Sequence, residues 1–215
     1  MVTVSKRKVS NPLALAVMAL LYERPMHPYE MVSVMRERAK HEAIRLRYSS
    51  LYSVVEALQR ELLISPLETV REGRRPERTV YGLTGEGRVE FLDWLRELLS
   101  VPAKEYTQFA AGLSFLAALP PGEAVELLEQ RVRLLEEEIK KMRSGMDAAA
   151  ERQGVARLFL IENEHELVLR EAELGWVREL VREIEVGTLG GLEEWEGFHS
   201  QSAAAGARRE EEDDG

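Results

Sequence analysis

Two stretches of this sequence collect side chains that suit contacts with a phosphate polyanion. The first stretch combines arginines with serine and tyrosine hydroxyl groups: Arg45, Arg47, Tyr48, Ser49, Ser50, Tyr52 and Ser53. The second is an arginine group in a short polar segment: Arg74, Arg75 and Arg78. Guanidinium groups pair with phosphate oxygens, and hydroxyl groups near a helix N-terminus donate to phosphates or base edges. These residues, together with Tyr29, are our candidates for contacts with double-stranded DNA.

Several of these assignments have a structural alternative. Tyr52 flanks an apolar stripe, so its ring could instead belong to a helical core. The arginines of the second stretch could form an ordinary charged hairpin tip. Lys6, Arg7 and Lys8 could form a basic arm that binds DNA, or a solvated chain end.

Charge is distributed unevenly along the chain. The 215 residues carry a formal net charge of −9, yet residues 1–85 contain 14 Lys and Arg against 9 Asp and Glu. The remaining residues contain 15 Lys and Arg against 29 Asp and Glu. A basic front joined to an acidic back indicates that the two parts bind different partners.

Composition narrows the class of protein further. The absence of cysteine excludes disulfides and thiolate metal sites and is compatible with a reducing cytoplasm. The apolar run from Leu13 to Leu21 is too short to span a bilayer and lacks a small-residue cleavage site. His165 has no partner at metal-binding spacing, and the sequence contains no phosphate-loop, nucleophile-elbow or dinucleotide-binding motif. We therefore expect a cytoplasmic protein that is not an enzyme and has no membrane segment, metal or cofactor.

The elements that must position the basic candidates lie in residues 12–100. Asn11 followed by Pro12 predicts a helix start, and this helix should run to about Glu23. A second helix should begin at Pro28. Ser49 and Ser50 offer a cap for a third helix, whose apolar stripe is formed by Leu51, Val54, Val55, Leu58 and Leu62.

A β-hairpin should follow the third helix. Residues 67–71 and 78–83 carry strand-like residues around a polar tip, and Thr84 offers the cap of a closing helix with Trp94 beside its core side. Three helices, a two-stranded wing and a closing helix form a winged helix-turn-helix domain. The predicted organisation is a basic arm over residues 1–11 and this domain over residues 12–100.

The back of the chain has a different character. Apolar residues at alternating spacings of three and four predict a coiled-coil seam: Val125, Leu128, Val132, Leu135, Ile139 and Met142. A second long helix repeats every seven residues: Leu160, Leu167, Leu174 and Val181. We expect an antiparallel hairpin over residues 101–187 that uses these residues in homodimerisation, because a lone hairpin leaves apolar surface wet. Residues 188–215 should be a disordered acidic tail.

Several motifs resemble one known family. The segments "LALAVMALLYERPMHPYEMVSVM", "SSLYSVVEALQRELLIS" and "REGRRPERTVYGLTGEGRVEFLDWL" are similar to the PadR family of bacterial transcriptional regulators in pattern, order and spacing, roughly over residues 12–99. The long C-terminal helices resemble, in architecture, the larger virulence-activator-like members. Two residues depart from the family pattern: Pro28 often is glycine there, and Leu62 stands where glycine is usual. The loss of that glycine predicts a different end for the third helix.

The resemblance implies a mainly helical, dimeric DNA-binding repressor that binds an inverted-repeat operator. It also implies release by a small aromatic or amphipathic molecule, held where the winged domain meets the C-terminal helices. Trp94, Phe109 and Trp176 are candidates for lining such an effector site, or they pack a core or dimer interface. An alternative function is a winged-helix adaptor that binds proteins through its acidic coiled coil and does not bind DNA.

Overall fold

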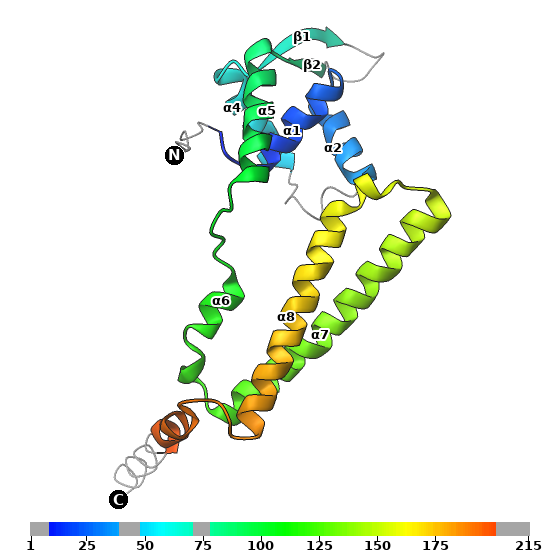
Figure 1. The fold of residues 1–215 in the computed structure, drawn as a ribbon. Helices are drawn as coiled ribbons and strands as arrows, with labels where there is room; N and C mark the ends of the chain where they lie inside the picture. The colour runs from blue at the N-terminus through cyan, green and yellow to red at the C-terminus, as the bar shows by residue number, and fades with distance from the viewer. Residues whose placement is uncertain (1–8, 39–47, 71–77, 201–215) are drawn as a thin grey trace, which may run out of the picture. The chain divides into compact units, whose positions relative to one another are not determined.

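The computed structural model describes residues 9–38, 48–70 and 78–200 (Figure 1). The chain divides into two compact units, Met1–Glu105 and Tyr106–Gly215, close to the boundary predicted after residue 100. The first unit contains a helical core with a two-stranded wing, and the second contains a long helical hairpin. No helix within the described residues is both long enough and apolar enough to cross a membrane.

Helix α1, Pro12–Glu23, begins where the sequence predicts. The Asn11 side chain accepts a hydrogen bond from the backbone N–H of Leu13 at 2.8 Å, and proline occupies the first turn. Buried residues surround most of the helix: Leu13, Ala14, Val17, Met18, Leu20 and Leu21. Helix α1 therefore lies inside the first unit, and the other elements pack around it.

Helices α2, Pro28–Glu37, and α4, Tyr48–Arg60, pack in the same helical core. Pro28 occupies the first turn of α2 and is accommodated, as expected for a proline at a helix start. Helix α4 begins one residue before Ser49, so the prediction that Ser49 or Ser50 caps it is wrong: both lie within the helix. Four of the five predicted stripe residues are buried: Leu51, Val54, Val55 and Leu58.

The C-terminal end of α4 explains the fifth stripe residue, Leu62. The N–H of Leu63 donates to the carbonyl of Leu58 at 2.9 Å, and the N–H of Leu62 donates to the carbonyl of Gln59 at 3.0 Å. This pair of bonds is a Schellman motif, which requires a left-handed residue at the position of Leu62. Leu62 has a φ of 60° and is 68% exposed. Leu62 therefore terminates the helix and is not a core residue. The helix ends in the same way as it would with glycine at this position, and not differently, as the loss of the glycine predicted.

Strands β1, Ile64–Val70, and β2, Arg78–Leu83, pair antiparallel from Ile64 opposite Leu83 to Val70 opposite Arg78. Strand β1 begins three residues before the predicted Leu67, because pairing continues through Pro66 with an irregularity between Pro66 and Glu68. Such an irregularity lets an edge strand contain a proline.

Helix α5, Gly85–Ser100, closes the first unit against the end of α4. Thr84 caps it as predicted: its hydroxyl oxygen accepts from the N–H of Gly87 at 2.9 Å and donates to the carbonyl of Leu62 at 2.8 Å. A Cβ atom on Gly87 would lie 1.9 Å from the carbonyl oxygen of Leu63, so only glycine permits this approach. The core side of α5 is shorter than the sequence suggests, because Leu98 and Leu99 are exposed.

The second unit consists of α6, Gln108–Leu113, two long helices and short helical segments between them. Helix α7, Pro121–Asp147, and helix α8, Ile161–Glu185, lie side by side and antiparallel (Figure 1). The short segments are η1, Leu116–Ala118, the π-helical turn η2, Ala148–Arg152, and η3, Arg157–Phe159. The predicted break contains Gly154, which has a φ of 64° and so takes the left-handed conformation that glycine allows.

The seam predicted for α7 and α8 packs within one chain. Leu128, Leu135 and Ile139 are buried against α8, and the remaining seam residues of α7 are half-buried: Val125, Val132 and Met142. On the partner helix, Leu174 and Val181 are buried and Leu167 is half-buried, whereas Leu160 immediately precedes α8. Arginine–glutamate pairs cross the hairpin, among them Arg143–Glu171 at 2.6 Å and Arg170–Glu138 at 3.5 Å. This seam therefore forms the core of an intramolecular hairpin.

The prediction of disorder from residue 188 onward is wrong for residues 188–200. A helix begins at residue 192, and Leu192 is buried in the cluster formed by α7 and α8. The indole N–H of Trp195 donates to the carbonyl of Leu119 at 2.8 Å. The apolar end of the hairpin thus gives this segment a surface to cover, which its polar composition alone did not suggest. Residues 201–215 lie outside the described residues.

Candidate nucleic-acid interface

Helix α4 presents a continuous polar face on the side opposite its buried stripe. Ser49, Tyr52 and Ser53 are exposed, and their spacing of three and four residues places them on one face of the helix. Tyr52 is 51% exposed, which excludes the alternative that its ring is a core residue. The Ser53 hydroxyl donates to the carbonyl of Ser49 at 3.1 Å, and Ser50 is half-buried. This face offers hydroxyl groups on a rigid helix.

Arg78 stands at the first residue of β2, next to the N-terminus of α2. Its Nη1 atom lies 3.4 Å from Nε2 of His27, and its guanidinium carbon lies 5.2 Å from the centre of the Tyr29 ring. Tyr29 is 54% exposed. The sequence predicted a role for Tyr29 and Arg78 but not for His27, whose position before the helix-starting Pro28 was the available signal.

Seven of the predicted contact residues belong to segments that the structure does not describe. Lys6, Arg7, Lys8, Arg45, Arg47, Arg74 and Arg75 lie outside the described residues. Tyr48 is the first residue of α4, and its backbone alone is described. Their roles stay predictions.

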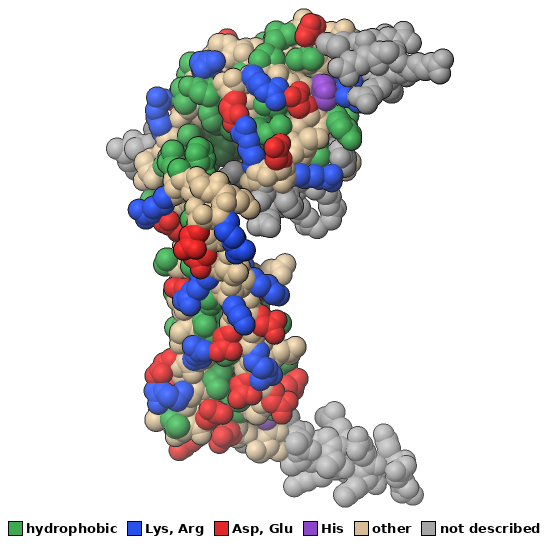
Figure 2. Space-filling view, turned by 90° about the vertical axis from the view of Figure 1, so that its right-hand side faces the viewer, with side chains coloured by type: hydrophobic (Ala, Val, Ile, Leu, Met, Phe, Trp, Pro, Cys, Tyr) green, Lys and Arg blue, Asp and Glu red, His purple; other side chains and the backbone are tan. Residues whose placement is uncertain are grey.

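Two other arginines of the first unit, Arg24 and Arg38, are neutralised by carboxylates. Arg38 makes a two-pronged ion pair with Glu23 at 2.5 and 2.8 Å, and Arg24 contacts Glu30 at 2.6 Å. The hydrogen bond from Arg38 lowers the pKa of Glu23 below its ordinary value. In the second unit, Lys and Arg alternate with Asp and Glu over the visible surface (Figure 2). Such mixed charge does not attract a polyanion.

The three aromatic effector candidates are not one cluster. Trp94 is 5% exposed and belongs to the core of the first unit, in agreement with the packing alternative. Phe109 and Trp176 meet edge to face in the second unit, with ring centres 6.3 Å apart. The Arg131 guanidinium lies 3.6 Å above the Phe109 ring and also donates to Glu173 at 2.6 Å. Phe109 and Trp176 are thus the aromatic pair that could contact a ligand.

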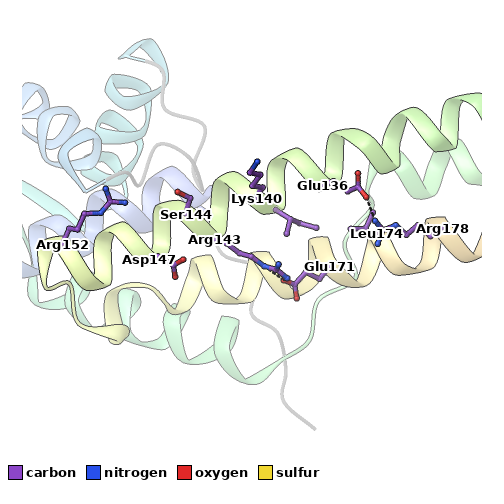
Figure 3. Close-up of a pocket in the computed structure, with 10 residues that line it drawn as sticks. Glu136, Lys140, Arg143, Ser144, Asp147, Arg152, Glu171, Leu174 and Arg178 are labelled. Atoms are coloured by element: carbon purple, nitrogen blue, oxygen red, sulfur yellow. Dashed lines mark hydrogen bonds and ion pairs between the residues drawn. The ribbon is translucent and has the colours of Figure 1, made fainter.

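A groove of about 620 Å³ runs along the other side of the hairpin (Figure 3). Ile139 and Leu174 line it, and the Arg143–Glu171 and Glu136–Arg178 pairs border it. None of the three aromatic candidates lines this groove. Because cations and carboxylates alternate around it and pair with each other, we assign it to the solvated, charged side of the hairpin.

The helical core, the antiparallel wing and the exposed polar face of α4 define a winged helix-turn-helix protein. The model of the transcriptional regulator PadR-like family matches residues 17–93. The negative transcriptional regulator PadR of Bacillus subtilis (strain 168) is 25% identical over 121 residues, which are 56% of this chain and 65% of that protein. The match thus spans just under two thirds of this relative. Residues 17–93 thus form a domain of the PadR-like family of transcriptional regulators, as the motifs predicted.

Solved structures share the fold. The structure of Bacillus subtilis PadR in complex with operator DNA has a TM-score of 0.61 and 20% identity, covering 80% of this chain and 98% of that one. The complex of the same regulator with p-coumaric acid has a TM-score of 0.64 and 17% identity, with the same coverage. The PadR-like regulator BC1756 from Bacillus cereus has a TM-score of 0.53 and 17% identity, covering 84% and 99%.

Proposed function

We propose that this protein is a homodimeric repressor that binds an inverted-repeat operator in double-stranded DNA. The observation that carries the proposal is the exposed face of Ser49, Tyr52 and Ser53 on α4 of a PadR-like domain. The relative from Bacillus subtilis is named a negative regulator, and its structure was solved with operator DNA. A similar role for this chain is consistent with its basic front half.

Helix α4 would enter the major groove, which is wide enough for one helix. The hydroxyl groups of Ser49, Ser50, Tyr52 and Ser53 would then face phosphates or base edges. Arg78 would contact a phosphate beside the wing, and the arginines outside the described residues would add further phosphate contacts. Each neutralised phosphate releases counterions, so affinity should fall steeply with salt.

Fluorescence anisotropy with the DNA upstream of the protein's own gene, beside an unrelated duplex, tests this proposal. We expect tighter binding to the upstream DNA, and Tyr52→Ala should weaken it while Tyr106→Ala, at an exposed tyrosine of the second unit, should not. Weak, equal binding to both duplexes would show that the upstream DNA does not contain the operator. No binding to either duplex at low salt would refute the DNA-binding function and favour the adaptor alternative.

The proposed dimer contact lies on the outer face of α8. Because the predicted seam residues are buried or half-buried within one chain, the apolar residues still exposed are the better candidates. Val168 and Leu169 are 61 and 56% exposed, on the side of α8 away from its buried residues. Large exposed apolar faces of this kind mark protein interfaces. A second copy would cover this face and present a second α4, as an inverted repeat requires.

Sedimentation of Val168→Glu tests the dimer. A buried carboxylate at the contact should dissociate it, whereas Ser144→Glu adds the same charge on the charged side of the hairpin and should leave the dimer intact. A wild-type protein that sediments as a monomer at all concentrations would refute the proposal.

We also propose that a small aromatic or amphipathic molecule releases the repressor. The named complex of the Bacillus subtilis regulator with p-coumaric acid supports this class of ligand. Phe109 and Trp176 are the aromatic residues we assign to it. p-Coumaric acid is a suitable first probe: it should change tryptophan fluorescence and dissociate the DNA complex, and both effects should weaken in Trp176→Leu. Unchanged DNA binding at saturating probe would exclude p-coumaric acid as the effector.

A further inference from the structure

Arg78 of the wing meets His27 and Tyr29 at the start of helix α2. His27 follows Met26, whose backbone exchanges two hydrogen bonds with Tyr81 of β2 at 3.1 and 3.0 Å. These backbone bonds fix the start of α2 against the strand that carries Arg78. The Arg78–His27 contact is therefore set by a rigid backbone arrangement.

Arg78 differs from Arg24 and Arg38 in the groups that it contacts. Arg24 and Arg38 are each paired with a carboxylate. The contacts described for Arg78 are with an imidazole and a phenol ring, neither of which carries a negative charge. Within the described residues, Arg78 thus keeps an uncompensated positive charge at the root of the wing.

The hydrogen bonding of His27 explains how its ring can contact Arg78 and still leave the N–H donors of Arg78 free to bind another group. Nδ1 of His27 accepts from the backbone N–H of Glu30 at 3.0 Å and so caps α2. A neutral imidazole has one acceptor nitrogen, so the proton lies on Nε2, the atom that faces Arg78. Nε2 then cannot accept from the guanidinium at 3.4 Å. The ring limits where Arg78 can lie but leaves its N–H groups available for another acceptor.

We propose that His27 is a positioning residue for DNA binding, whose ring packs beside Arg78 and confines the guanidinium to the orientation that binds a phosphate at the root of the wing. Tyr29 supports the guanidinium from a second side through its ring face. The inference rests on the proposed DNA-binding function and adds to it the residue that fixes the wing-root arginine. His27 itself need not touch DNA.

A double-mutant cycle separates this role from a purely structural one. His27→Asn keeps a side-chain oxygen that can cap α2 but removes the ring beside Arg78. Arg78→Met removes the charge. The assay is anisotropy with a mixed-sequence duplex at low salt, repeated as salt is raised, with unfolding curves for each full-length variant.

We expect His27→Asn to unfold like the wild type and to bind DNA about three- to tenfold more weakly. Arg78→Met should weaken binding and reduce the log–log salt slope by about 0.9, the value for one phosphate contact. In the Arg78→Met background, His27→Asn should have no further effect on affinity. His27→Ala should lower the unfolding midpoint as well, because it also removes the cap.

Three results would overturn the inference. If the wild type binds DNA and His27→Asn binds equally tightly, His27 has no positioning role, although the proposed function stands. If His27→Asn weakens binding equally with and without Arg78, it does not act through Arg78. If the wild type binds no duplex, the proposed function fails and this inference fails with it. If His27→Asn fails to fold, Tyr29→Leu can replace it in the cycle with Arg78→Met. The Tyr29 ring also contacts Arg78 and is 54% exposed, so its loss should not disturb folding.

Discussion

The backbone conformation of Leu62 gives a test of how the third predicted helix ends. Leu62 occupies the left-handed position of the Schellman motif with a φ of 60°. This conformation costs an L-residue about 1–2 kcal/mol, because its Cβ crowds the following carbonyl oxygen. Glycine has no Cβ and avoids this cost.

Two opposing effects reduce the gain from Leu62→Gly. The residue is 68% exposed, so deleting its side chain forfeits about a third of the burial free energy of a leucine, roughly 0.5–1 kcal/mol. Glycine also increases the entropy of the unfolded chain, at a cost of about 0.5–1 kcal/mol. Leu62→Gly should therefore be about as stable as the wild type. Leu62→Ala, which loses the contacts and keeps the strain, should be less stable than Leu62→Gly by roughly 0.5–1 kcal/mol.

Hydrogen exchange of peptides that span α4 measures these differences in the first unit of the full chain. Leu98 is a matched control, because it is an exposed leucine within α5. There the order should reverse, with Leu98→Ala more stable than Leu98→Gly by about 1 kcal/mol. If Leu62→Ala were at least as stable as Leu62→Gly, as expected for the Leu98 pair, the assignment of strain to Leu62 would be wrong.

Two further substitutions test contacts within the first unit. Gly87→Ala should lower the free energy of unfolding by about 2 kcal/mol or more, because its Cβ would overlap the Leu63 carbonyl oxygen. Gly85→Ala, whose Cβ would meet nothing within 4 Å, is the control, and equal small effects of both would contradict this packing. Glu23→Gln should cost well under about 1 kcal/mol at neutral pH, since Glu23 and Arg38 are both exposed. Arg38 lowers the pKa of Glu23 below 4.5, so the stabilisation exists above that pH and disappears as pH falls through the lowered pKa; unfolding curves of the two proteins should converge in acid.

The sequence predicted those parts of the fold that depend on interactions between residues close to each other in the chain. The buried stripe of α4 follows from helical periodicity, and the Asn11 and Thr84 caps follow from side chains that accept from the next turn. The start of β1 was placed late because pairing of Ile64 with Leu83 depends on a partner strand. Leu62 was misassigned because periodicity continues past the point where the backbone turns.

The candidate interface could likewise be predicted only where it depends on residues that are close in sequence. The exposed face of α4 could be predicted, because Tyr52 and Ser53 lie opposite an apolar stripe. The role inferred for His27 could not, because it depends on Arg78, which lies 51 residues away in sequence. The order of residues 188–200 also depends on distant partners, since Trp195 bonds to Leu119, which lies 76 residues earlier in the sequence.

The intramolecular seam of α7 and α8 has a consequence for how the regulator responds to its own abundance. Because one chain completes the hairpin core, each chain can fold before it meets a partner, and the proposed dimer can dissociate without unfolding. Dimer concentration would then follow the square of monomer concentration wherever monomers predominate. Dilution of the regulator, as during rapid growth, would thus empty an inverted-repeat operator more sharply than it would empty a site that binds single chains.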